Sequence, residues 1–262
     1  MPVDLASTVM GRGPPAIVLH GLFGSGTNWR SIARRLEHRL ECHLVDQRNH
    51  GRSPHAPGMA YSALAADVLA YLDAHRVDRT GIIGHSMGGK AAMALALTAP
   101  ERVRWLIVAD VAPAPSPSDH RPILEALKAL PLDALATRGA ADTALIPSIP
   151  DSGLRQFLLR NLVVDGARLR WRIDLDAIAG ALPDLTDFPP TRPGAVYEGP
   201  TLFLRGERSD YLTDRHEPHI RALFPFAAVA TIAAAGHWLH AEQPAAVVAR
   251  IERFLDEHAP GC

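Results

Sequence analysis

The sequence has 262 residues, of which 47% are hydrophobic and 21% are charged, enough apolar material for one large α/β domain or two small ones. Its formal net charge of −1 excludes the strong basic footprint of a nucleic-acid-binding protein. The two cysteines, Cys42 and Cys262, are too few for a disulfide framework and lack metal-ligand spacing. We therefore expect neither a nucleic-acid partner nor a bound metal.

No targeting or membrane segment is expected. Residues 1–13 lack a basic region followed by a long apolar stretch, so they do not resemble a signal peptide. The longest largely apolar run, residues 227–235, is far too short to span a bilayer. A reducing cytoplasm is the expected location.

Short apolar runs recur along the chain, and each ends in a polar or glycine-rich turn. They are continuous rather than alternating, which is typical of parallel strands buried on both faces. The predicted strands are 16–19, 42–45, 80–83, 105–109, 201–204 and 228–232.

Helical patterns separate several of these runs, notably at 62–72, 87–99 and 244–255. Pro100 ends the second helix, and Pro244 suits the first turn of the third. Alternating strands and helices predict an α/β fold with a doubly wound, mostly parallel sheet.

A long insertion interrupts this alternation. Residues 112–200 contain no strand of the core type but include helical pieces at 123–130, 154–162 and 175–182. We interpret 112–200 as a helical lid over the carboxyl ends of the strands, with 1–111 and 201–262 as the core. A structural excursion at the sheet edge is the alternative. The lid helices could also pack against a second copy of the chain, as in a homodimer.

Ser86 is the predicted nucleophile. Residues 84–88 read Gly-His-Ser-Met-Gly, directly after an apolar strand and directly before a helix. So tight a turn strains the backbone of its central residue, which is tolerable when small neighbours leave room. The hydroxyl would then stand at a helix N-terminus, where developing negative charge is favoured. A glycine-serine helix cap without chemistry is the alternative interpretation.

A serine hydroxyl needs a base, and His237 is the predicted one. It follows the last core strand and precedes the last helix, at the same sheet edge as Ser86. His240, three residues further on, is the alternative base.

Two aspartates qualify as the acid that orients the base. Asp110 ends one core strand, and Asp210 lies in the loop after the next one, so both stand at carboxyl ends. The residue pattern alone leaves the choice open, since either could be a loop hydrogen bonder.

Acyl transfer also needs donors for an oxyanion. The backbone N–H groups of Met87 and Phe23 are the predicted donors, with both side chains free to line an acyl pocket. Neighbouring loop residues are predicted to complete that pocket. They are His20, Gly21, Leu22, His85 and Trp238.

Together these motifs resemble the α/β-hydrolase superfamily over nearly the whole chain. The resemblance rests on residues 20–24 (HGLFG), 46–53 (DQRNHGRS), 84–90 (GHSMGGK) and 236–240 (GHWLH). It implies an α/β-hydrolase fold with a lid, and hydrolysis of short- to medium-chain acyl esters or thioesters without a cofactor.

A narrower similarity is to small bacterial esterases and their mitochondrial relatives. It rests on residues 49–51, Lys90, residues 110–113, 157–162 and 171–172. That branch carries an aspartate at the position of Asp110 and often lacks one at position 210, which favours Asp110 as the acid.

The expected activity is that of a serine esterase acting on a small acyl ester through an acyl-enzyme. A C–C hydrolase, a lyase or a perhydrolase could use the same three side chains. A ligand-binding member of the fold without turnover is a third interpretation, which the intact Ser86 and His237 disfavour.

Overall fold

A seven-stranded sheet is the centre of the computed structural model, which describes residues 1–166 and 168–259. Its strand order is β1-β3-β2-β4-β5-β8-β9, and β1 alone in this described sheet runs antiparallel to its neighbour. Cys262 lies outside the described residues. The strands of the sheet are β1 (Ser7–Met10), β2 (Pro15–Leu19), β3 (Glu41–Val45), β4 (Thr80–His85), β5 (Val103–Ala109), β8 (Thr201–Gly206) and β9 (Ala227–Ile232).

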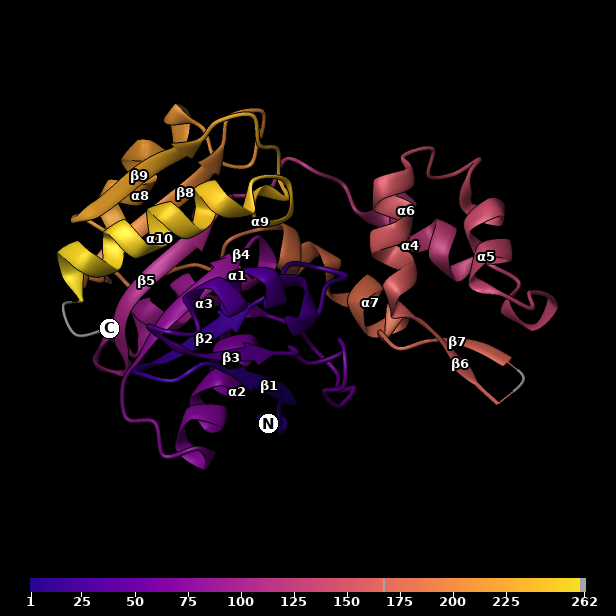
Figure 1. Cartoon of the computed structure of the whole chain (residues 1–262), viewed down its shortest axis with the longest axis horizontal. Coiled ribbons are helices and arrows are strands. Elements are labelled where there is room, and N and C mark those ends of the chain that lie inside the picture. Colours follow the sequence, from indigo (N-terminus) through magenta and orange to yellow (C-terminus); the bar gives the residue numbers. More distant parts are fainter. Residues whose placement is uncertain (167, 260–262) are drawn as a thin grey trace.

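Helices cover both faces of this sheet, which confirms the predicted doubly wound fold (Figure 1). One face packs against α1 and α10, and the other against α2 and α3. The helices of the core are α1 (Arg30–Leu36), α2 (Tyr61–Ala74), α3 (Met87–Thr98), α8 (Glu217–Leu223), α9 (Leu239–Glu242) and α10 (Pro244–His258).

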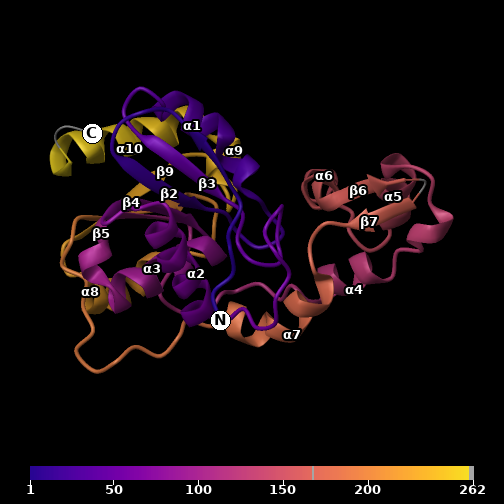
Figure 2. The same ribbon diagram turned by 90° about the horizontal axis from the view of Figure 1, so that it is seen from below.

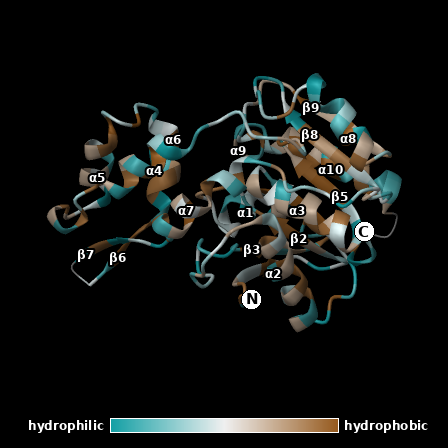
Figure 3. Ribbon diagram, turned by 180° about the vertical axis from the view of Figure 1, so that it is seen from behind, coloured by the Kyte–Doolittle hydropathy of each residue, from teal (hydrophilic) through white to brown (hydrophobic). Residues whose placement is uncertain are grey.

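The continuous apolar runs are explained by this two-sided packing. In β2, Ile17 and Leu19 belong to the hydrophobic cluster that includes α2 and α3, whereas Ala16 and Val18 belong to the cluster with α1 and α10. Successive side chains point to opposite faces, so both faces need apolar residues. The strands at the centre of the sheet are accordingly hydrophobic in Figure 3.

The insertion between β5 and β8 forms a separate layer. In Figures 1 and 2 its elements lie together beside the core, with α7 between them and the sheet. The insertion contains α4 (Arg121–Lys128), α5 (Arg138–Leu145), α6 (Ser152–Leu158), α7 (Leu175–Thr186) and a hairpin of β6 (Leu162–Asp165) and β7 (Arg168–Trp171).

Several elements of the structure were not expected from the sequence, namely the strand β1, the helices α1, α5, α8 and α9, and the hairpin of β6 and β7. The edge strand β1 and the helix α5 lack the long apolar runs that predict an element. The hairpin corrects the expectation of a purely helical insertion. Its alternating pattern of exposed Arg168 and Arg170 around buried Leu169 is that of a strand with one solvated face.

Lys90 connects both ends of the insertion to helix α3. Its buried amine donates to the Ser116 hydroxyl at 2.9 Å, to the Thr186 carbonyl at 2.8 Å and to the Asp187 carbonyl at 3.0 Å. Burial lowers the pKa of Lys90 to about 8. Ser116 lies in the segment that leads from β5 into the insertion, which we call the first stem. Thr186 and Asp187 lie in the segment that leads back toward β8, the second stem. The single side chain of Lys90 therefore holds both stems.

Replacing Lys90 by methionine is predicted to loosen the insertion. The change keeps the chain length but leaves two carbonyls without their charged donor, which should lower the free energy of unfolding by about 2–3 kcal/mol. Lys128→Met is the matched control, because Lys128 is exposed and its ion pair with Asp176 should contribute less than about 1 kcal/mol. Urea unfolding and limited proteolysis of the stems measure both effects. Equal behaviour of the two variants would contradict the role given to Lys90.

Candidate active site

Ser86 stands in the turn between β4 and α3 with φ +52° and ψ −118°, a conformation that residues with side chains rarely adopt. A Cβ on Gly84 would lie 2.3 Å from the carbonyl oxygen of Gly88, and one on Gly88 would lie 2.4 Å from that of Leu19. Neighbouring backbone therefore leaves no room for a side chain at either glycine. The tight turn presents the Ser86 hydroxyl at the N-terminus of α3.

Three predicted residues from distant parts of the chain form one hydrogen-bonded path. His237 Nε2 lies 3.0 Å from Ser86 Oγ, and His237 Nδ1 lies 2.8 Å from Asp110 Oδ2. A carboxylate only accepts hydrogen bonds, so Nδ1 carries the proton and Nε2 accepts from the Ser86 hydroxyl. The arrangement can remove a proton from Ser86 while Asp110 stabilises the positive charge that forms on the imidazole.

The two candidate acids occupy very different surroundings. Asp110 is completely buried and also accepts the Gly206 N–H at 2.8 Å and the Ser209 hydroxyl. Asp210 is exposed, and within the described chain it makes no hydrogen bond to His237. The structure thus brings Asp110 to the histidine and leaves Asp210 at the surface.

Two residues beside Asp210 contact the path, and neither was predicted from the sequence. Ser209 donates to the carboxylate of Asp110, and the ring of Tyr211 stacks on that of His237 with centroids 3.7 Å apart and planes 18° from parallel. Their position in the same loop as an alternative acid is the signal that could have drawn attention to them.

The loop after β2 corrects one predicted oxyanion donor. The N–H of Phe23 already donates to His50 Nε2 at 3.2 Å, and its carbonyl accepts from Asn161 of the insertion at 2.7 Å. Within the described residues, the N–H groups of Leu22 and Met87 have no partner. Leu22 lines the cavity at Ser86, and Met87 directly follows Ser86 in the chain. Leu22 therefore replaces Phe23 as the candidate donor.

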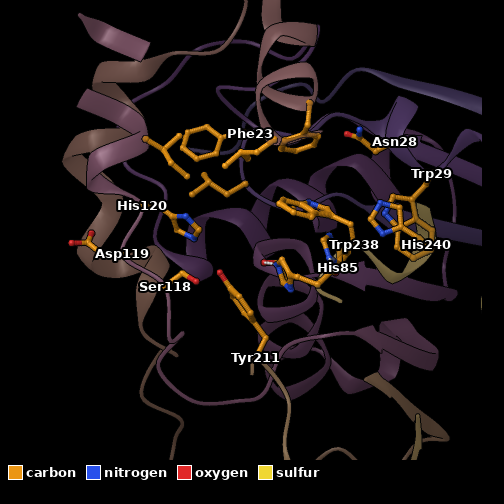
Figure 4. Close-up of a pocket in the computed structure, with 18 residues that line it drawn as sticks. Phe23, Asn28, Trp29, His85, Ser118, Asp119, His120, Tyr211, Trp238 and His240 are labelled. Carbon is orange, nitrogen blue, oxygen red and sulfur yellow. Dashed lines mark hydrogen bonds between the residues drawn. The ribbon is translucent and has the colours of Figure 1, made fainter. Parts of the chain in front are cut away.

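An apolar cavity of about 280 Å³ opens at Ser86 and His237 (Figure 4). Of the predicted pocket residues, Gly21, Leu22, His85 and Trp238 line it, as does the side chain of Phe23. The insertion contributes several further lining residues that were not predicted from the sequence. These are Ser118, Asp119, His120, Ile123, Leu154 and Phe157.

His20 and Met87 are corrections to the predicted pocket, because neither lines the cavity. His20 is buried and holds the loop from behind: its Nδ1 donates to the Gly21 carbonyl at 2.8 Å, and its Nε2 accepts the Gln47 N–H at 3.0 Å. The side chain of Met87 is packed in the core cluster. Both residues support the site rather than contact a ligand through their side chains.

Several buried histidines in the cavity wall or behind the loop after β2 are neutral. Burial lowers the pKa of His20 to about 4 and the pKa of His50 and His240 to about 3. Burial also holds the pKa of His85 well below its ordinary value, and its Nε2 donates to the His237 carbonyl at 2.8 Å. His240, the alternative base, stacks on Trp29 and makes no hydrogen bond to Ser86 in the described structure.

The described residues contain no group of three or more histidine, cysteine, aspartate or glutamate side chains arranged to hold a metal ion. None of their helices is both long enough and apolar enough to cross a membrane.

A family model described as the alpha/beta hydrolase fold matches residues 14–244. The chain belongs to the α/β-hydrolase family. The resemblance inferred from the four motifs is therefore confirmed. In this α/β-hydrolase, the three hydrogen-bonded side chains follow the chain order Ser86, Asp110, His237, which is the order of nucleophile, acid and base in the fold.

Named relatives and a solved structure resemble this α/β-hydrolase over most of its length. Mouse sn-1-specific diacylglycerol lipase ABHD11 is 41% identical over 250 residues, which cover 92% of this chain and 81% of the mouse protein. Esterase YbfF of Escherichia coli is 37% identical, with 93% of each chain covered. The solved structure of a marine microorganism esterase is 40% identical with a TM-score of 0.94, covering 97% of this chain and 100% of that one. The predicted similarity to bacterial esterases with eukaryotic relatives is confirmed.

Separate asparagine substitutions test the two acids. Asp110→Asn should lower kcat by a factor on the order of 10³–10⁴, because the amide no longer stabilises the histidine tautomer and its positive charge. Asp210→Asn should leave kcat within about twofold, because the side chain is exposed and does not touch the path. Steady-state kinetics on a p-nitrophenyl ester measure both. Near-full activity of Asp110→Asn with a collapse of Asp210→Asn would show that the wrong acid has been chosen.

The neutral buried histidines predict a loss of stability in acid. His50 binds a proton below about pH 6.5 when unfolded but only near pH 3 when folded, so stability falls as the pH drops through this window. The slope should be up to about 1.4 kcal/mol per pH unit for each such histidine. His50→Gln should flatten the pH dependence measured by urea unfolding, whereas His38→Gln, at an exposed position, should not. Equal slopes in the two variants would contradict this account.

Proposed function

We propose that this α/β-hydrolase is a serine esterase, which hydrolyses short- to medium-chain acyl esters or thioesters through an acyl-enzyme on Ser86. The observation that carries the proposal is the hydrogen-bonded path from Ser86 through His237 to Asp110 in the wall of an apolar cavity. Relatives named esterase and lipase support the same reaction class.

The first half of the reaction forms the acyl-enzyme. His237 Nε2 takes the Ser86 proton as Ser86 Oγ attacks the acyl carbonyl, and the Leu22 and Met87 N–H groups donate to the oxyanion. The bond to the leaving alcohol or thiol then breaks, and His237 returns the proton to the leaving atom. Buried Asp110 accepts the hydrogen bond from His237 Nδ1 and stabilises the imidazolium in both transition states.

Water completes the cycle at the same side chains. His237 removes a proton from the water as it attacks the acyl carbon, and the same two N–H groups hold the second oxyanion. Collapse of this intermediate releases the acid and returns the proton to Ser86 Oγ. The net reaction consumes only the ester and one water molecule, and the protein is regenerated unchanged.

The cavity argues for a small acyl group. Its volume of about 280 Å³ lies just below the range for small-molecule sites, roughly 300–1,000 Å³. Apolar side chains from the core loop and the insertion line it, including Leu22, Ile123, Leu154 and Phe157. Burying an aliphatic acyl chain of modest length in this cavity is favourable, whereas burying a charged acyl group there would cost free energy.

A C–C hydrolase, a lyase and a perhydrolase remain alternatives because they can use the same path. A panel of matched esters, thioesters, β-diketones and peracid-forming conditions separates them from an esterase. A ligand-binding protein without turnover would leave the Ser86 hydroxyl inert toward organophosphates. Cytoplasmic location and a homodimer formed through the insertion remain predictions from the sequence.

Replacing Ser86 by alanine is the direct test. Ser86→Ala should abolish turnover of a short p-nitrophenyl ester and block covalent labelling by an organophosphate, because the attacking oxygen is removed. The unchanged melting temperature of the variant serves as the folding control. Normal hydrolysis by Ser86→Ala would overturn the proposal, and absence of labelling in the natural protein would favour the ligand-binding interpretation.

A further inference from the structure

The loop after β8 touches the catalytic path at two points. Ser209 donates to the Asp110 carboxylate, and Tyr211 stacks on His237 at 3.7 Å. The residue between them, Asp210, is exposed. The loop after β8 therefore does not supply the acid. It supplies a hydroxyl that binds the Asp110 carboxylate and a ring that packs on His237.

The stacked ring constrains a motion that the hydrogen bonds of His237 leave open. Asp110 and Ser86 hold the two ring nitrogens of His237, whose N–H bond and lone pair lie in the plane of the imidazole. Tilting of the ring out of that plane is opposed only by what packs on its faces. Tyr211 covers one face almost parallel to it, 18° between planes, so a tilt would drive the two rings together.

The same contact favours the charged form of the base. Each transition state places a positive charge on His237, and the electron-rich face of an aromatic ring attracts a cation that lies against it. The Tyr211 hydroxyl stays protonated at neutral pH, because burial raises its pKa. The ring therefore meets the imidazolium as a neutral phenol and not as a competing base.

Tyr211 is itself held from the side of the insertion. Its hydroxyl is directed toward Ser118, which lies in the first stem of the insertion, and toward His120 (Figure 4). Its backbone N–H donates to the Ser209 hydroxyl at 3.3 Å. The ring is thus fixed between the loop that supports Asp110 and the stem that Lys90 anchors through Ser116.

From this geometry we propose that Tyr211 is a positioning residue for His237. Its ring holds the imidazole in the plane of the Asp110 and Ser86 bonds and stabilises the imidazolium. Its hydroxyl fixes the position of that ring relative to the first stem of the insertion. The proposal rests on the esterase function proposed above. The alternative is that Tyr211 acts only as part of the cavity wall and contacts the substrate without affecting His237.

Two variants of Tyr211 separate the ring from the hydroxyl. Tyr211→Leu removes the stack and should lower kcat about tenfold while KM stays within about twofold, because the cation–ring attraction acts in the transition states only. Tyr211→Phe keeps the stack and should retain kcat within about threefold. Both are assayed with a short p-nitrophenyl ester, and the rate of Ser86 labelling by a fluorophosphonate should fall in parallel with kcat.

Phe157→Leu is the matched control for loss of a ring from the same cavity. Phe157 lines the cavity but contacts Trp238 rather than His237, so its removal should act mainly on KM. A Tyr211→Leu variant that raises KM with unchanged kcat would show a wall role and overturn the proposal. Equal loss of kcat in Tyr211→Phe and Tyr211→Leu would also overturn it, because the ring would then not be the active part.

The same two assays on the natural protein distinguish a failure of this proposal from a failure of the proposed function. If the natural protein neither hydrolyses esters nor reacts with the fluorophosphonate, the esterase function fails and this proposal fails with it. If it does both and Tyr211→Leu matches it in kcat, only the role of Tyr211 is refuted. Thermal melting of each variant confirms that the compared proteins are folded.

Discussion

The carboxylate of Asp110 is the group on which the remainder of the site depends. A buried charge is costly unless hydrogen-bond donors surround it, and here the donors are the Gly206 N–H, the Ser209 hydroxyl and His237. They come from the end of β8, the loop beyond it and the loop after β9. Parallel pairing of β5 with β8 and of β8 with β9 brings these three segments to one edge. The register of the sheet therefore sets the catalytic distances.

Much of this could be predicted because it follows from periodicity and strand direction. Continuous apolar runs predict strands buried on both faces, and the carboxyl ends of parallel strands must share an edge, which placed Ser86, His237 and two aspartates together. The residue pattern left the choice between Asp110 and Asp210 open, and before the structure only the family resemblance favoured Asp110; burial and the bond to His237 now separate the two aspartates. The bond from Phe23 to His50 joins loops 27 residues apart, and no local pattern indicates it.

The insertion is joined to the catalytic core by polar contacts as well as by apolar packing. The side chain of Asn161 donates to the carbonyl of Phe23 in the loop after β2. The Tyr61 hydroxyl donates to the Leu185 carbonyl at 2.7 Å. Directional bonds of this kind fix position more narrowly than apolar contacts do, because they weaken steeply with angle. The shape of the cavity is consequently a joint property of two layers, neither of which forms it alone.

The position of Lys90 has a consequence for exchanging insertions between relatives. The lysine lies in the first turn of α3, four residues after Ser86 at the N-terminal end of that helix, so one short segment carries both Ser86 and the anchor of both stems. A foreign insertion grafted between β5 and β8 would have to present a hydroxyl and two carbonyls at matching points, or leave an ammonium group buried without acceptors beneath it. Chimeras that preserve residues 116 and 186–187 should thus accept new cavity walls, whereas cuts made inside those stems should not.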